Sequence, residues 1–126
     1  MSRLIDPRFA IRARVLKARV QGDTFHVVAP LVAEAIAGFS ILPRAERNWI
    51  EWRLVRPALE LLPIDEEDAE SAALLQVTLR RAGLQLATVD ALVAAVALRY
   101  DLTVLTTDRD FSAVSGMACE NWLAVP

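Results

Sequence analysis

The sequence predicts an α/β domain in which helices flank a parallel sheet. Short apolar runs alternate along the chain with longer segments of helical periodicity, a pattern typical of parallel sheets. The chain has 126 residues, the size of one domain, and a hydrophobic fraction of 55% that is sufficient for a packed core. Its four Gly, six Pro and single Cys exclude low-complexity sequence, a disulfide framework and a Cys-rich zinc module. We therefore expect one domain over residues 1–126.

The first half of the chain is predicted to contain three helices and two strands. Apolar residues recur at helical spacing across residues 7–20, which predicts an amphipathic helix. Pro30 favours a helix start because its missing N–H is not needed there, and Pro57 favours a helix end. The predicted elements are a helix over 7–20, a strand over 24–28, a helix from 30 to about 40, a helix over 44–56 and a strand over 59–62.

The second half is predicted to contain two long helices and two strands. The acids of Asp65-Glu66-Glu67-Asp68 favour a helix N-terminus, where the macrodipole stabilises negative charge. Gly83 favours the end of that helix, and Thr88 is a candidate cap for the next. The predicted elements are helices over 65–83 and 89–100, a strand over 102–106, a loop or short helix over 108–114 and a weak strand over 117–125.

Charge is distributed unevenly along the chain. Residues 1–20 hold six basic side chains and one acid, Asp6, although the whole chain has a net charge of −2. This basic segment is either a surface for RNA phosphates or an acidic partner, or the solvated face of a helix. Every apolar run is far shorter than the roughly 18 residues of a membrane span, and the first twenty residues contain charges throughout. We expect a cytoplasmic protein with no membrane partner.

Several common catalytic motifs are absent from the sequence. It contains neither a P-loop nor a G-x-G-x-x-G motif, which gives a P-loop or dinucleotide-binding fold no support. His26 is the only His and falls within a predicted buried strand, so a structural role is favoured over that of a general base. Cys119 is expected to be a structural thiol.

Three carboxylates stand in or beside apolar sequence. Glu34 interrupts an apolar helix, Asp90 opens another, and Asp108 follows the strand over 102–106. Because ligands in α/β sheets bind at the carboxyl ends of strands, we expect these acids to lie near one edge. Acids that gather without nearby basic groups favour a hard cation, Mg²⁺ or Mn²⁺. Taken one at a time, Asp90 can be a helix-capping acid and Asp108 a turn residue.

The same residues resemble the PIN-domain nucleases. The stretch ATVDALVAAVA at 87–97, followed by LTVLTTDRDF at 102–111, is similar to that family's D-x-x-I-A-A-x-A, strand and T-x-D-x-D-F pattern, with Val93 at the Ile position. VVAPLVAE at 27–34 resembles the segment that carries the family's second acid. The resemblance spans roughly residues 7–125 and is greatest to the VapC-like toxin ribonucleases of type II toxin–antitoxin pairs.

The resemblance implies a three-layer α/β/α fold with a central parallel sheet, and a metal-dependent endoribonuclease that cleaves RNA with Mg²⁺ or Mn²⁺. Glu34, Asp90 and Asp108 are then the metal-binding catalytic acids. Supporting positions around them are expected for Asp110, Thr106 and Thr107. Arg109 is a candidate contact to an RNA phosphate.

The resemblance also implies a homodimer and a small antitoxin protein as partner. Trp49 and Trp52, on the predicted helix over 44–56, are the strongest candidates for such an interface. Trp and Arg are enriched at interface hot spots, and Arg53 lies beside them. Packing of both indoles in the core is the alternative.

The N-terminus departs from the family pattern, which begins with a central strand that ends in an Asp. The only early candidate is Asp6, 28 residues before Glu34, which is shorter than the usual interval. Asp6-Pro7 also fits the start of the helix at 7–20. We therefore interpret residues 1–5 as the end of a helix, and expect a chain N-terminally truncated relative to the family, whose sheet lacks the first strand and its acid. A catalytically inactive PIN-like interaction module is then the alternative function, unless Asp6 substitutes for that acid.

Overall fold

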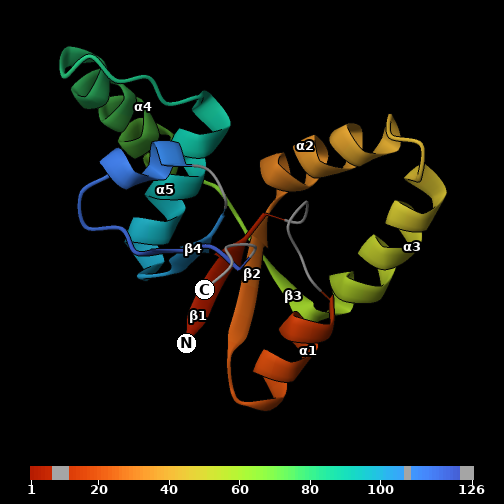
Figure 1. Ribbon diagram of the computed structural model, residues 1–126. Coiled ribbons are helices and arrows are strands. Elements are labelled where there is room, and N and C mark those ends of the chain that lie inside the picture. Colours follow the sequence, from red (N-terminus) through yellow and green to blue (C-terminus); the bar gives the residue numbers. More distant parts are fainter. Residues whose placement is uncertain (7–11, 107–108, 123–126) are drawn as a thin grey trace.

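The computed structural model describes residues 1–6, 12–106 and 109–122, and its centre is a five-stranded sheet (Figure 1). The strand order is β3-β2-β1-β4-β5, and every neighbouring pair is parallel. The strands are β1 (Ser2–Ile5), β2 (Thr24–Val28), β3 (Leu59–Leu62), β4 (Thr103–Leu105) and β5 (Cys119–Glu120). The predicted α/β class with a parallel sheet is therefore confirmed.

Helices cover both faces of this sheet (Figure 1). On one side lie α1 (Arg12–Val20) and α3 (Ala45–Val55), and on the other α4 (Glu66–Arg81) and α5 (Thr88–Tyr100). The helix α2 (Ala29–Ser40) contributes side chains to both apolar clusters, Leu31 to the one around α5 and Ile36 to the one around α3. Short 3₁₀ helices, η2 (Arg56–Ala58) and η3 (Arg109–Ala113), precede β3 and follow β4. None of the helices among the described residues is long and apolar enough to span a membrane.

Residues 2–5 form the central strand of the sheet, so the interpretation of residues 1–5 as the end of a helix is wrong. The sheet has the central strand that it was expected to lack, since β1 lies between β2 and β4. Leu4 is buried in the cluster against α5, and Ile5 in the cluster against α1 and α3. A strand covered on both faces reads as a short apolar run, which periodicity does not distinguish from the last turn of a helix.

Most of the other predicted elements agree with the structure within a few residues, but the strand predicted over 117–125 is much shorter among the described residues, Cys119–Glu120. The strands at 24–28 and 59–62 have the predicted bounds, and the segment over 108–114 contains η3. The first part of the helix predicted over 7–20 lies outside the described residues. Thr88 does not cap α5: the N-cap is Ala87, and the Thr88 hydroxyl accepts a hydrogen bond from Gln76 Nε2 at 3.3 Å.

Candidate active site

The carboxyl ends of β1 and β4 bring two buried polar side chains together. Ile5 and Leu105 are register partners, so the residues that follow them, Asp6 and Thr106, leave neighbouring strands at the same edge. Asp6 is 5% exposed and Thr106 is 8% exposed. A buried Asp at this edge is notable because acids are seldom fully buried without a compensating interaction.

A third polar residue, Asp90, comes from the first turn of α5. Asp6, Asp90 and Thr106 line one small cavity of about 20 Å³, whose other described walls are the apolar side chains of Leu31, Val93, Val104 and Phe111. The cavity has room for about one water-sized group. The described residues that line it include no Lys or Arg.

The donor set of this cavity fits a hard divalent cation. Two carboxylates and a hydroxyl supply oxygen ligands, which Mg²⁺ and Mn²⁺ prefer. Within residues 1–6, 12–106 and 109–122, three acidic, His or Cys side chains do not gather closely enough to form a metal site by themselves. Two carboxylates are nevertheless sufficient for Mg²⁺, which usually retains several waters and binds substrate phosphates as well.

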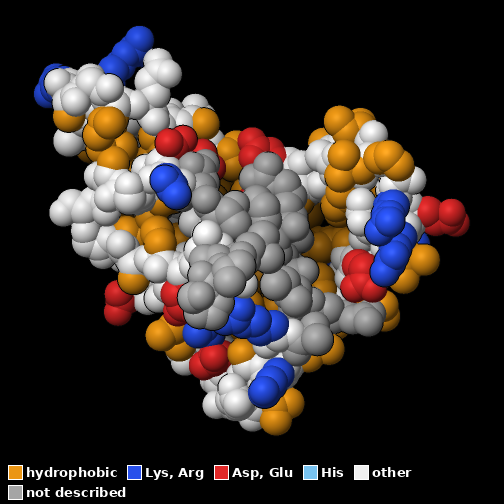
Figure 2. All heavy atoms as spheres, viewed as in Figure 1, with side chains coloured by type: hydrophobic (Ala, Val, Ile, Leu, Met, Phe, Trp, Pro, Cys, Tyr) orange, Lys and Arg blue, Asp and Glu red, His pale blue; other side chains and the backbone are white. Residues whose placement is uncertain are grey.

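The other predicted site residues are distributed around this cavity. Glu34 is exposed on α2 and is not among the described residues that line it. Asp108 and Thr107 lie outside the described residues. Arg109 and Asp110 are both exposed on η3, next to Phe111 of the cavity wall. In Figure 2, acidic side chains are visible on both sides of the notch in the upper half of the molecule, over the η3 and α5 region and over the beginning of α2.

Asp6 is a candidate site residue whose place in the fold the sequence interpretation gives wrongly. It was considered as a helix cap, whereas it ends the central strand of the sheet. The signal that identifies it is local. Leu4-Ile5-Asp6 is an apolar run followed by an acid, the arrangement that singled out Asp108 after the strand over 102–106.

An ion-pair network holds the helix that carries Asp90. Asp65 and Asp68 form a capping box at the start of α4, and Arg99 of α5 donates from Nη1 to Asp65 Oδ2 at 2.9 Å and to Asp68 Oδ2 at 2.8 Å. The hydrogen bond from the Asp68 backbone, together with Arg99, lowers the pKa of Asp65. This network joins α4 to α5 and so helps to fix the position of α5 against the sheet.

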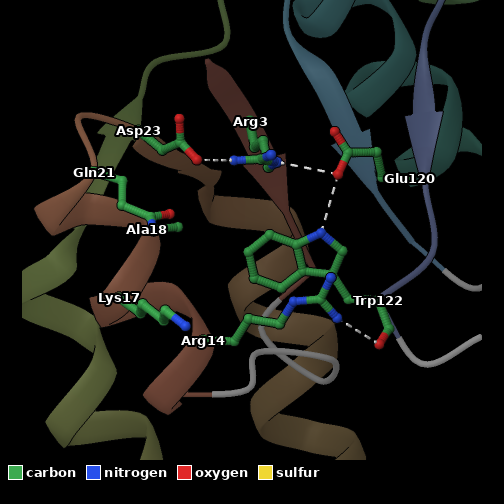
Figure 3. A pocket seen from close by; sticks show the side chains of 8 residues that line it. All are labelled: Arg3, Arg14, Lys17, Ala18, Gln21, Asp23, Glu120 and Trp122. Atoms are coloured by element: carbon green, nitrogen blue, oxygen red, sulfur yellow. Dashed lines mark hydrogen bonds and ion pairs between the residues drawn. The ribbon is translucent and has the colours of Figure 1, made fainter.

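A second polar cluster lies on the α1 side of the sheet, near the start of β1 (Figure 3). Arg3 donates from Nη1 to Asp23 Oδ2 at 2.7 Å and from Nε to Glu120 Oε2 at 3.4 Å. Trp122 Nε1 donates to the same Glu120 oxygen at 3.0 Å. The Arg14 guanidinium lies 4.3 Å from the centroid of the Trp122 ring, and Arg14 Nη1 donates to the Trp122 carbonyl at 3.0 Å. These residues line a pocket of about 540 Å³.

The charges of this cluster compensate one another. Burial alone would lower the pKa of Arg3, but its hydrogen bonds and charge interactions with Asp23 and Glu120 outweigh burial and raise it. The hydrogen bond from Arg3, followed by that from the N-terminal amine, lowers the pKa of Asp23. Arg3 and Asp23 are thereby held in their charged forms, as expected of a structural ion pair.

The remaining candidates have structural surroundings. His26 is half-buried on β2, and its Nδ1 lies 3.6 Å from Glu60 Oε2 on the neighbouring strand. Cys119 is exposed on β5, and partial burial of its thiol raises the pKa of that thiol, which disfavours the reactive thiolate. Trp52 is buried in the core, and Trp49 is half-buried with its ring edge-to-face against Phe39 at 5.5 Å. The core interpretation therefore holds for Trp52.

Comparisons with known proteins agree with this architecture. A chain of VapBC2 from Rickettsia felis, in a structure with a DNA fragment from its promoter, superposes with a TM-score of 0.80 at 20% identity, covering 97% of this chain and 99% of that one. DNA-bound VapBC from Salmonella typhimurium superposes with a TM-score of 0.77 at 24% identity, covering 97% of this chain and 99% of that one. VapC20 from Mycobacterium tuberculosis, a sarcin-ricin loop cleaving toxin, superposes with a TM-score of 0.66 at 16% identity. The match covers 94% of this chain and 97% of that one. At these identities the likeness establishes a shared fold.

The sequence comparisons give the family. No curated protein matches this chain. The model of the PIN domain, however, matches residues 4–117, which begin within β1 and end just before β5. Since this match covers most of the sequence, the chain belongs to the PIN domain family.

Proposed function

We propose that this protein is a metal-dependent endoribonuclease that hydrolyses phosphodiester bonds of RNA with Mg²⁺ or Mn²⁺. The observation that carries the proposal is the cavity where Asp6, Asp90 and Thr106 converge at the carboxyl edge of the sheet. Membership of the PIN domain family supports the same chemistry. Among the structural neighbours, VapC20 is described as a toxin that cleaves the sarcin-ricin loop.

Asp6 and Asp90 are the two residues of this cavity that would hold the cation, and we retain Glu34 and Asp108 as further ligands, direct or through water. When bound, a divalent cation polarises the scissile phosphate and makes an attacking water available at neutral pH. The two carboxylates would hold and orient that water. Phosphates of the substrate would complete the metal's coordination, as is usual for Mg²⁺.

The residues around the acids would position the RNA. The Thr106 hydroxyl is suited to hydrogen-bond a carboxylate and fix its orientation, and Thr107 and Asp110 are proposed for similar supporting roles. The apolar walls formed by Leu31 and Phe111 limit access of bulk water, which strengthens electrostatic interactions in the cavity. Arg109, exposed on η3, is proposed to contact a phosphate.

We further propose that the protein acts in the cytoplasm as the toxin of a toxin–antitoxin pair. The structural neighbours include VapBC assemblies, and FitAcB from Neisseria gonorrhoeae also superposes with a TM-score of 0.71. Ile50 and Leu54 on α3 are 53% and 50% exposed, and Ile41 after α2 is 86% exposed. Such exposed apolar side chains are suited to a homodimer or antitoxin contact.

The catalytically inactive alternative depended on the absence of an acid after the first strand. Asp6 occupies that position at the end of β1. The reason for preferring an interaction module over an enzyme is therefore removed, and the ribonuclease is the better-supported function.

The test is cleavage of total bacterial RNA by the purified chain, with Mg²⁺, with Mn²⁺ and with EDTA. We expect cleavage that requires the metal and that Asp90→Asn abolishes while the circular dichroism spectrum is unchanged. The matched control is Asp101→Asn, the same change at the exposed opposite end of α5. Asp101 has a φ of 54°, a conformation that Asn adopts readily. Unchanged cleavage by Asp90→Asn would refute the assignment.

A further inference from the structure

A hollow of about 640 Å³ lies between α4, the loop that joins α4 to α5, and η3. Its polar lining consists of Gln76 and Arg80 from α4, Gln85 from the loop and Asp110 from η3. Its apolar lining includes Val77 and Leu86. The volume is within the range of small-ligand pockets, about 300–1,000 Å³.

This hollow adjoins the candidate active site along two elements. Ala87 lines the hollow and is the N-cap of α5, and Asp90 lies three residues further on, about 4.5 Å along the helix axis. On η3, Asp110 lines the hollow while its neighbour Phe111 lines the cavity of Asp6 and Asp90. Figure 1 shows the η3 segment beside α5 and below α4. The hollow and the cavity of the acids are therefore neighbours, and one polymer can contact both.

The polar side chains of the hollow are one cation, one acid and two amides. Arg80 is exposed, and its guanidinium forms no ion pair with an acid among the residues that the structure describes. Gln85 is also exposed. Gln76 is held in place, because its Nε2 donates to the Leu86 carbonyl at 2.9 Å and to Thr88 Oγ1 at 3.3 Å. Among the described residues, none donates a hydrogen bond to the Oε1 of Gln76.

We propose that the hollow binds one unpaired nucleotide of the RNA substrate, next to the phosphate that is cleaved. Arg80 contacts a phosphate of that nucleotide, the amide of Gln85 reads the edge of its base, and Val77 and Leu86 support the face of the base. Proteins read RNA sequence mainly through unstacked bases, whose edges donate and accept hydrogen bonds and whose faces pack on side chains. The inference rests on the proposed ribonuclease function and adds to it a site that selects the nucleotide.

The roles of Arg80 and Gln85 are separable by experiment. A phosphate contact is independent of the base. Its loss therefore weakens the binding of every RNA sequence equally and lowers the salt dependence of binding. A contact to a base edge discriminates between bases, so its loss reduces the differences among them. Arg81, exposed on α4 next to Arg80 and absent from the described lining of the hollow, is the matched control.

The experiment measures binding of four fluorescent RNA pentamers, A5, C5, G5 and U5, to the full chain carrying Asp90→Asn, which prevents cleavage. Arg80→Ala should weaken all four by about tenfold, the usual effect of losing one charge-assisted contact. Gln85→Ala should reduce the spread of affinities among the four. Arg81→Ala should leave both quantities unchanged, and equal melting temperatures will show that all variants are folded.

The outcomes separate this inference from the proposed function. Metal-dependent cleavage by the wild type, with equal pentamer affinities in Arg80→Ala and Arg81→Ala, overturns the nucleotide site and leaves the ribonuclease intact. Absence of cleavage by the wild type, with the expected loss in Arg80→Ala, overturns the ribonuclease and supports an RNA-binding hollow. If no pentamer binds, or if binding is insensitive to both variants, the hollow is not an RNA site, and a protein partner becomes its better occupant.

Discussion

The two ends of β1 carry charged side chains in opposite situations. Arg3, near the start of the strand, is surrounded by acids, with Asp23 at 2.7 Å and Glu120 at 3.4 Å. Asp6, just after the end of the strand, shares a cavity with a second acid, Asp90, and with no basic residue among the described ones that line it. Among the described residues, the start of β1 thus lies in a cluster of paired opposite charges, and its end leads into a cavity that two carboxylates line.

The alternation of a strand explains why the two groups face different helices. Arg3 and Ile5 point to the side of α1, where Arg14 and Trp122 complete the Arg3 cluster. Leu4 points to the side of α5, and Asp6 meets Asp90 of that helix. Pairing of opposite charges contributes to holding the fold together, whereas bringing like charges together costs free energy and is typical of a functional site.

The largest expected effect tests this contrast at Asp6. Asp6→Asn should reduce metal-dependent RNA cleavage by about a hundredfold or more, because a lost carboxylate ligand costs several kcal/mol of transition-state stabilisation. Initial rates at saturating Mg²⁺ measure the effect. Asp23→Asn is the control at the other cluster and should retain cleavage at temperatures below its melting point. Equal cleavage rates of Asp6→Asn and Asp23→Asn would show that Asp6 is no more important for catalysis than the Arg3 cluster.

The second effect concerns stability. Arg3→Met should lower the free energy of unfolding by about 2 kcal/mol at pH 7, because Asp23 and Glu120 would lose their shared cation. Urea denaturation followed by circular dichroism measures it. Arg19→Met, at an exposed position on α1, is the control and should change little. A loss for Arg3→Met no larger than that for Arg19→Met would mean that the cluster contributes nothing to stability.

Much of the fold follows from the sequence because buried strands and amphipathic helices leave local signals. The apolar runs at 24–28 and 59–62 gave the bounds of β2 and β3, and the acids before α4 marked its start. The strand β1 was not predicted, because Asp6-Pro7 also has the sequence of a helix start. Local capping preferences cannot show that Leu4 and Ile5 pack against helices on opposite faces, which are far along the chain.

The site was predicted in part for the same reason. Asp90 was found because it opens an apolar helix, and it does line the cavity. Its closeness to Asp6 depends on the pairing of β1 with β4, a contact across about a hundred residues that spacing does not reveal. The Arg3 cluster was missed because it joins both ends of the chain, with Glu120 lying 117 residues after Arg3. In each case the local sequence indicates the kind of side chain involved, but it does not predict which distant residue that side chain contacts.

A third, smaller effect is the stabilisation of the fold by a cation bound at the cavity of Asp6 and Asp90. Mg²⁺ or Mn²⁺ should stabilise the folded chain by about 1.4 kcal/mol at ten times the dissociation constant, since a ligand of the native state alone stabilises it. Thermal melting with and without millimolar metal measures the shift. The increase should persist in Arg3→Met, whose cluster is remote from the cavity, and disappear in Asp90→Asn. An equal shift in Asp90→Asn would place the cation elsewhere.

The smallest effect is a pH dependence at the cluster of opposite charges. Because Arg3 lowers the pKa of Asp23 below its value in the unfolded chain, the interaction stabilises the fold above that unfolded pKa, about 3.9. The stabilisation is lost as the pH falls through the lower, folded pKa. The melting temperature of Asp23→Asn should therefore lie below that of the wild type from pH 7 to about pH 5, and the gap should close below about pH 4.

Asp101→Asn provides the control for that titration, because Asp101 is exposed at the end of α5, away from the cluster. The difference in melting temperature between Asp101→Asn and the wild type should not close below about pH 4, as it should for Asp23→Asn. A gap for Asp23→Asn that stays constant down to pH 3 would show that Arg3 needs the shape of the side chain at position 23 and not its charge. The cluster would then owe its stability to hydrogen bonding and to packing against Trp122, and the contrast between the two ends of β1 would no longer be one of charge.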